Sequence, residues 1–195
     1  MIYIVSKRKS VKTLLREYHD AVIVDVTSSS PTEFVMLSPF YPHGNIPIPN
    51  SEGVTASCVE AVWQGLKVFE SSDIDTSLFY NDTMRNLKRT IRKYGKPLGH
   101  RFGVKSKTLL DYIDARKLIY IPTYNWVLEN KAEDLIKKLA AIAAKQNLVL
   151  LDYNTNGDVE RTDTPLSHAS LIKAYIESNY TINKKHIPSN LFDYE

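Results

Sequence analysis

The sequence of 195 residues has one cysteine, no long apolar run and no metal-binding histidine spacing. A lone cysteine, Cys58, excludes an internal disulfide framework and a cysteine-rich zinc site, and it suits a reducing compartment. The five histidines form no HxH or HExxH pattern, so we expect no metal ion and no cofactor. No apolar stretch approaches the roughly 20 residues that cross a bilayer, and at the N-terminus the apolar residues precede the basic ones, the reverse of a signal peptide. The sequence therefore predicts a cytoplasmic protein without a membrane segment.

Motifs of several common enzyme classes are also missing. The segment GHRFG at 99–103 has neither the lysine nor the strand-to-helix context of a P-loop. There is no GxSxG nucleophile elbow, and Cys58 has no obvious base partner in the sequence. Hydrolysis through a serine or cysteine nucleophile is therefore not supported.

Acidic residues are missing between Met84 and Leu110, where nine basic residues fall. The formal net charge of +3 is modest, so the distribution of charge says more than the total. A basic cluster attracts phosphate groups, and we select Arg85, Arg89 and Arg92 as candidate contacts to a phosphate or a nucleic acid. A solvated helix face beside a basic loop explains the same pattern equally well.

Hydrophobic periodicity and turn residues predict one α+β domain over residues 1–178, mostly helical around a small mixed sheet, with a C-terminal tail at 179–195. Strands are expected at 3–5, 21–26 and 148–151, with extended chain at 33–37. Helices are expected at 11–18, 57–70, 82–94, 106–119, 124–145 and 166–177. Four prolines and two glycines predict an ordered loop at 38–53. Gly95 is expected to end the helix before it, and Pro122 to break the helix at 106–119 or a short strand after it.

The predicted helix at 57–70 carries a polar stripe of Glu60, Gln64 and Lys67 at i, i+4 and i+7, directly after the proline-rich loop. A carboxylate beside such a loop serves as a general acid or base, or stabilises a cationic sugar in a transition state. A solvated helix face with i,i+4 pairing is the alternative, and spacing alone favours it.

The predicted strand at 148–151 is followed by four polar side chains, Asp152, Asn154, Asn156 and Asp158. A strand end delivers such groups to a frequent site position. The alternating Asp and Asn residues invite a calcium loop, but its twelfth position is Asp163 in place of Glu, and the flanking segments are a strand and a loop, so we reject calcium. Turn formation by Asn and Gly is an equally good explanation.

The proline-rich loop contains Phe40, Tyr41 and His43, whose rings are suited to stacking on a base or a sugar. A lone histidine in such a loop is more often structural or merely exposed.

Two segments resemble the NADAR superfamily. LSPFYP at 37–42 is similar to its LSNFYP strand and loop, and CVEAVWQGLKVF at 58–69 is similar to its SVExxYQxxKF helix. Weaker likenesses follow in LKRTIRKYGKPLGHR at 87–101, ARKLIYIPTYNWVLENK, LVLLD at 148–152 and PLSHASLIKAYI. The resemblance covers roughly residues 33–178. The whole chain also resembles an uncharacterised family of this length from bacteria and tailed phages.

The NADAR resemblance implies hydrolysis of an N-glycosidic bond in a phosphorylated ribosyl small molecule or in ADP-ribosylated nucleic acid. Glu60 matches the catalytic glutamate of the motif, and Gln64 and Lys67 match its Gln and Lys. The resemblance also implies a phosphate contact, for which Arg101 is our first choice, and a stacking surface at Trp63 or Trp126. By position alone, Asp152 is a second catalytic candidate, with Asn154, Asn156 and Asp158 as substrate contacts.

The sequence departs from the NADAR pattern at Trp63, where the family has Tyr, in LSPF for LSNF, and in the missing late WGxG motif. A non-catalytic accessory protein that binds nucleotides or nucleic acid is therefore the main alternative, and a structural protein of a larger assembly is a third. The oligomeric state stays open. The position of Glu60 discriminates between an enzyme and a binding protein. Glu60 in a pocket favours catalysis, whereas Glu60 on an open surface refutes the glycosidase hypothesis.

Overall fold

A computed structural model describes residues 1–181 of the chain. Its fold is α+β, as the sequence predicts, and it contains three small sheets in place of the single mixed sheet expected. Of the predicted tail, residues 182–195 lie outside the described part of the chain.

The first sheet is parallel, with the strand order β1-β8-β2. Its strands are β1 (Ile2–Ser6), β8 (Asn147–Asp152) and β2 (Ala21–Asp25). The central strand β8 is buried along almost its whole length, which explains its continuous apolar sequence. Because the strands are parallel, the carboxyl ends of all three lie at the same edge of the sheet.

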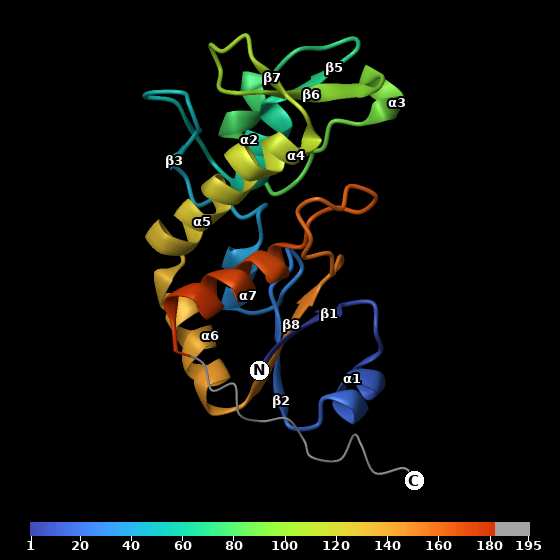
Figure 1. Cartoon of the computed structure of the whole chain (residues 1–195), viewed down its shortest axis with the longest axis vertical. Coiled ribbons are helices and arrows are strands. Elements are labelled where there is room, and N and C mark those ends of the chain that lie inside the picture. The colour runs from blue at the N-terminus through green and yellow to red at the C-terminus, as the bar shows by residue number, and fades with distance from the viewer. Residues whose placement is uncertain (182–195) are drawn as a thin grey trace.

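Helices cover both faces of this sheet (Figure 1). On one face lies α1 (Val11–Glu17), whose N-terminus is capped by Ser10 and whose Leu14 packs against β8. On the other face lie α6 (Glu133–Lys145) and α7 (His168–Asn179). We call these elements together the sheet lobe.

A second body, residues 46–111, forms around α2 (Val59–Gly65), and we call it the α2 lobe. It holds two antiparallel sheets: β3 (Ile46–Pro47) with β4 (Thr55–Ala56), and β5 (Lys67–Phe69) with β6 (Pro97–Arg101) and β7 (Leu109–Leu110). Its remaining elements are the 3₁₀ helix η2 (Thr76–Tyr80) and the single turn α3 (Ile91–Tyr94). Its core contains Val62, Leu66 and Phe79.

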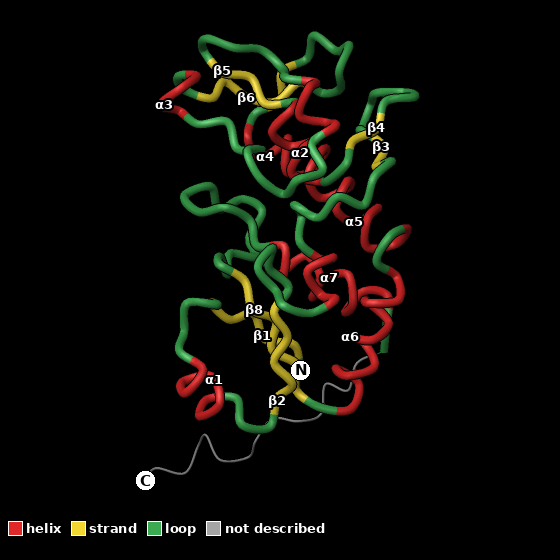
Figure 2. The backbone as a smooth tube through the Cα atoms, turned by 180° about the vertical axis from the view of Figure 1, so that it is seen from behind, coloured by secondary structure: helices red, strands yellow, loops and turns green. Residues whose placement is uncertain are grey.

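One helical segment joins the two lobes, as Figures 1 and 2 show from opposite sides. It runs without a break through α4 (Tyr112–Ala115), the π-helical turn η3 (Arg116–Tyr120) and α5 (Ile121–Asn130). Tyr124 of α5 is fully buried and donates its hydroxyl to the carbonyl of Leu37, at the end of the 3₁₀ helix η1 (Glu33–Leu37). The connection therefore packs against both lobes and fixes their separation.

Several predicted elements are confirmed with shifted ends. The strand–helix–strand unit at the N-terminus, the buried strand at 148–151, the polar loop after it and the final helix are all present. The predicted helix at 124–145 is two helices, α5 and α6, which meet at Lys131 and Ala132. Pro122 does not end the helical segment, which continues through it, and it is the second residue of α5, directly after the π-helical turn η3.

Other predicted elements are wrong. Residues 33–37 form a 3₁₀ helix and not extended chain. The predicted helix at 82–94 is reduced to α3, because Met84 and Asn86 both adopt φ of 58° and interrupt it, although Gly95 ends it as expected. The predicted helix at 57–70 ends at Gly65, and residues 106–119 give a strand before the capped start of α4 at Asp111.

Candidate functional site

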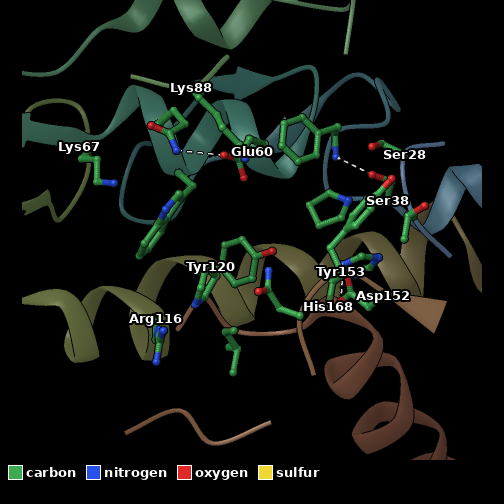
Figure 3. A pocket seen from close by; sticks show the side chains of 18 of the residues that line it. Ser28, Ser38, Glu60, Lys67, Lys88, Arg116, Tyr120, Asp152, Tyr153 and His168 are labelled. Atoms are coloured by element: carbon green, nitrogen blue, oxygen red, sulfur yellow. Dashed lines mark hydrogen bonds and ion pairs between the residues drawn. The ribbon is translucent and has the colours of Figure 1, made fainter. Parts of the chain in front are cut away.

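A pocket of about 510 Å³ lies between the carboxyl edge of the parallel sheet and α2. Its lining comes from α2, from η3 and from the loops that follow all three parallel strands. Figure 3 shows Glu60, Lys67 and Lys88 on one side, facing Arg116, Tyr120, Asp152 and His168 on the other. The pocket is therefore built by residues that are far apart in the sequence.

Glu60 is the central acidic group of this pocket. It lies in the first turn of α2 and is only 8% exposed, and its Oε1 accepts a hydrogen bond of 2.9 Å from Gln64 Nε2. Burial raises the pKa of Glu60 above its ordinary value, although Gln64, Lys88 and Lys67 favour the carboxylate and oppose the shift. The solvated helix face is therefore the wrong interpretation of this stripe, because both Glu60 and Gln64 are buried.

Gln64 is held at both ends of its amide. Its Nε2 donates to Glu60, and its Oε1 accepts from the backbone N–H of Arg89. This pairing fixes the orientation of the amide, so that Gln64 presents a donor to the carboxylate.

Arg89 is buried and serves as a structural brace for this part of the site. Its guanidinium donates to the carbonyls of Lys67 and Asp73 and to Ser72 Oγ. The prediction that Arg89 contacts a phosphate is therefore wrong, because the residue is buried and both of its terminal nitrogens, Nη1 and Nη2, already donate to protein acceptors.

Two lysines border Glu60 without a carboxylate partner among residues 1–181. Lys67 is half-buried, and burial lowers its pKa while Glu60 opposes that shift. Lys88 Nζ lies 5.8 Å from the ring centroid of Phe40, which also lines the pocket. The two ammonium groups make the surroundings of Glu60 attractive to anions.

Aromatic rings form one wall of the pocket. Trp63 packs against Tyr120 with a centroid separation of 5.5 Å and against His100 at 3.8 Å. His100 is buried behind Trp63 with both ring nitrogens unpartnered, and burial lowers its pKa to about 3, so it stays neutral. Burial, with Glu60 and Asp152 nearby, raises the pKa of Tyr120 well above its ordinary value. Within the described chain its hydroxyl has no hydrogen-bond partner, so it remains a free O–H donor in the pocket.

Asp152 has a structural role at the opposite wall. Its Oδ2 accepts hydrogen bonds from Ser167 Oγ (2.7 Å), from His168 Nδ1 (3.0 Å) and from the backbone of Ala169 (3.3 Å). Burial opposes the charge, but these donors outweigh it and lower the pKa of Asp152. The prediction of Asp152 as a catalytic group is therefore not supported, because its lone pairs are already used to join β8 to α7.

His168 is held as an imidazolium ion. Its Nδ1 faces the Asp152 carboxylate and its Nε2 lies 2.9 Å from the carbonyl oxygen of Val26. Both partners are acceptors, so both ring nitrogens carry a proton. Burial opposes this charge, yet the Asp152 bond prevails and raises the pKa of His168. A ring in this state has no free nitrogen to act as a base.

Arg116 anchors the polar loop after β8. Its side chain is fully buried and donates to the carbonyls of Val159, Arg161 and Thr164 at 2.7–2.8 Å. Asn156 donates to two of the same carbonyls. Asn156 is therefore a structural residue of this loop and not a substrate contact as predicted.

The remaining loop candidates divide between the pocket and the surface. Asn154 lines the pocket, whereas Asp158 is exposed and accepts from the backbone of Glu160. Turn formation, the alternative explanation of this segment, thus holds for Asp158.

Several other predicted residues do not reach the pocket. His43 bonds to the carbonyl of Met36 and packs against Tyr41. Arg101 is paired with the carboxylate of Asp73, with N–O distances of 3.1 and 2.9 Å. Three more predicted residues also lie outside the pocket lining: Trp126 is half-buried, and Arg85 and Arg92 are exposed.

Of the predicted substrate contacts, the pocket brings together a compact set. These contacts are Phe40, Trp63, Gln64, Lys67 and Asn154, and both predicted catalytic residues, Glu60 and Asp152, line the same pocket. Sequence reasoning missed a second set, which includes Arg8, Thr27, Ser28, Lys88, Tyr112, Arg116, Tyr120 and His168. The sequence contains a signal for Arg8, Thr27 and Ser28, since the predicted strands at 3–5 and 21–26 end shortly before them. Their alignment with the end of β8 follows only from the parallel sheet.

Within residues 1–181 no group of three or more His, Cys, Asp or Glu side chains is placed to hold a metal ion. In the same part of the chain, no helix has both the length and the apolar character needed to cross a membrane.

A family model described as a family of unknown function (DUF6939) matches residues 6–172, which include every pocket residue discussed above. No curated protein matches the chain.

Proposed function

The chain belongs to DUF6939, a family of unknown function, and we propose from its pocket that it is an N-glycosidase-like hydrolase of the cytoplasm. Its substrate carries a base–ribose or ADP-ribose N-glycosidic bond in a phosphorylated nucleotide or a nucleic acid. The observation that carries the proposal is Glu60, a buried carboxyl group with a raised pKa in a pocket otherwise rich in cations. A buried acid of this kind is typical of proton-transfer catalysis.

The proposed chemistry uses Glu60 at the anomeric carbon. The bond between C1′ and the base nitrogen breaks, and its electron pair leaves with the base. The positive charge that develops on the sugar is stabilised by the Glu60 carboxylate, which also orients a water molecule. The water oxygen then bonds to C1′, and the proton that it loses is taken up by Glu60. Gln64 holds the carboxylate in position, and the Tyr120 hydroxyl offers a donor to the substrate.

The charge and size of the pocket support a phosphorylated substrate. Lys67, Lys88 and Arg8 line it without a carboxylate partner in the described part of the chain. The volume of about 510 Å³ falls within the roughly 300–1,000 Å³ that is usual for small-molecule sites. An anionic ligand of nucleotide size satisfies both features.

The proposed relation to NADAR supports the same interpretation. Three residues that match its motif, Glu60, Gln64 and Lys67, line a single pocket together. The departure at Trp63 also falls in this pocket, where the indole packs beside Tyr120. We expect Trp63 to shape the space for the base.

A non-catalytic protein that binds nucleotides or nucleic acid is the second candidate. It is favoured by the exposed basic side chains Arg85, Arg92, Lys93 and Lys96, near which Tyr80 is 77% exposed. If this surface binds nucleic acid, the affinity falls steeply with salt and with replacement of Arg85 and Arg92 by Ala. Affinity that does not depend on salt contradicts this candidate.

The test of the proposed activity is a mass-spectrometric hydrolysis assay. Wild type, Glu60→Gln and the control Glu52→Gln are incubated with ADP-ribosylated guanosine, short modified DNA and ribosylated pyrimidine phosphates. Glu52 is exposed and is not part of the pocket lining, so its substitution controls for the loss of one carboxylate. We expect release of the base or ribose by wild type and by the control, and its loss in Glu60→Gln. If wild type releases nothing from any of these substrates, we favour the binding protein in place of the enzyme.

A further inference from the structure

The three parallel strands each deliver one unpartnered polar side chain to the same end of the pocket. Arg8 follows β1, Ser28 follows β2 and Asn154 follows β8, and all three line the cavity. Within residues 1–181 none of these side chains has a hydrogen-bond or ion-pair partner, whereas most polar side chains around them do. Crevices at the carboxyl ends of parallel strands are frequent ligand sites.

A neighbouring network explains why Arg8 and not Lys7 is the free cation. Lys7 Nζ is bonded to the carboxylate of Asp25 and to the hydroxyls of Thr27 and Ser29. Asp25 in turn accepts from the backbone and the hydroxyl of Thr27. This network neutralises Lys7 and braces the loops, so the guanidinium of Arg8 remains available to a ligand.

We propose that Arg8, Ser28 and Asn154 bind the terminal phosphate of the substrate, which makes the substrate an N-glycoside of ribose 5-phosphate. This proposal rests on the glycosidase function proposed above for its orientation of the sugar. A guanidinium, a hydroxyl and an amide NH₂ all donate hydrogen bonds, and a phosphate monoester offers only acceptors at neutral pH. None of the three side chains adds a carboxylate that would repel it.

The position relative to Glu60 decides between this end of the pocket and the lysine end. Lys88 and Lys67 lie on the same side of the pocket as Glu60 (Figure 3), and their positive charges favour its carboxylate. A phosphate held between them would lie against the catalytic carboxylate and repel it. In a ribose 5-phosphate, by contrast, the phosphate is attached across the ring from C1′. Arg8 comes from the opposite lobe and suits that geometry, with Glu60 and Tyr120 at the anomeric carbon.

The first test is calorimetric binding of ribose 5-phosphate and of ribose, neither of which contains a bond to be hydrolysed. The variants are Arg8→Ala, Arg8→Lys, Lys88→Ala and the control Arg16→Ala, which removes an exposed arginine of α1 outside the pocket. We expect Arg8→Ala to weaken binding of ribose 5-phosphate about 10- to 100-fold, Arg8→Lys to restore part of it, and Arg16→Ala to change nothing. The affinity for ribose should be the same in all of them.

The result that overturns the subsite is equal affinity of wild type and Arg8→Ala, or a loss confined to Lys88→Ala. Failure of wild type to bind ribose 5-phosphate overturns it as well. Competition distinguishes the sources of the phosphate: uridine 5′-monophosphate should displace ribose 5-phosphate, and short DNA without a terminal phosphate should not. Displacement by that DNA alone refutes a monoester site.

The hydrolysis assay separates this proposal from the proposed activity. If Arg8→Ala hydrolyses a phosphorylated substrate with an unchanged KM, the subsite is refuted and the activity stands. If binding of ribose 5-phosphate depends on Arg8 but wild type hydrolyses nothing, the subsite stands and the activity is refuted.

Discussion

Replacement of Asp152 by Asn tests whether the structure holds a charged histidine in its interior. The Asp152–His168 pair is almost fully buried, with side-chain exposures of 6% and 9% and an N–O distance of 3.0 Å. Asparagine keeps an acceptor for Ser167 and Ala169 but leaves the imidazolium without its counter-charge. Loss of one partner from a buried ion pair costs about 3–5 kcal/mol, and we expect this decrease in the free energy of unfolding at pH 5.5.

The pH dependence follows from the directions of the two shifts. The pKa of His168 is raised above its ordinary 6.5, so its contribution to stability is complete below pH 6.5 and is lost as the pH rises through the folded-state value. The pKa of Asp152 is lowered from its ordinary 3.8, so its contribution is complete above pH 3.8 and is lost as the pH falls through the folded-state value. The pair therefore stabilises most between these two ordinary values.

The assay is urea unfolding of wild type, Asp152→Asn and the control Asp163→Asn between pH 4.5 and 9. Asp163 is an exposed carboxylate paired with Arg161, and its substitution should have little effect at any pH. The difference between wild type and Asp152→Asn should shrink as the pH rises from 6.5 through the folded-state pKa of His168. A difference that stays constant across this range refutes the imidazolium, as does an NMR spectrum of wild type at pH 5.5 with only one protonated ring nitrogen.

Two further predictions concern the frame of the pocket. Arg116→Ala removes donors to three loop carbonyls and should lower the free energy of unfolding by about 3 kcal/mol. Hydrogen exchange should become faster first in residues 153–166, and a uniform increase across the chain would contradict this role. Gly65→Ala should destabilise the protein by about 1–3 kcal/mol in thermal unfolding, because the added Cβ would lie 2.3 Å from Phe79 Cε1. The second substitution Phe79→Leu should recover part of this loss. If Gly65→Ala leaves the stability unchanged, the structure relaxes the contact without cost.

The sequence contains enough local signal to predict the three strands of the sheet lobe, although not that they form a separate parallel sheet. Strands rich in β-branched residues and the run LVLLD identify β1, β2 and β8, since burial on both faces demands apolar residues. Helix ends in the α2 lobe were harder, because they depend on contacts between distant residues. Gly65 ends α2 where the ring of Phe79 leaves no space for a side chain, and no local pattern records that.

The candidate site was predictable only in its α2 half. The stripe of Glu60 and Gln64 is visible in the sequence, but its burial depends on the loop at 38–53 and on η3 closing over it. Periodicity also assigned Arg89 to a solvated face, whereas the left-handed residues Met84 and Asn86 turn the chain so that its guanidinium points inward. Arg8 and Ser28 belong to the pocket only because β8 inserts between β1 and β2.

Because of the π-helical turn η3, the geometry of the site depends on the number of residues between the two lobes. A π-turn accommodates one more residue than an α-helical turn, and here that turn contains both Arg116 and Tyr120. Deletion of a single residue would convert it to a regular α-helix and rotate everything before it by about 100° relative to α5. Tyr112 and Arg116 would then leave the pocket wall together, while each remained chemically intact. A change in the length of this segment should therefore disturb the pocket more than a single substitution within it, and relatives that align without gaps from α4 to α5 are the ones expected to share this pocket.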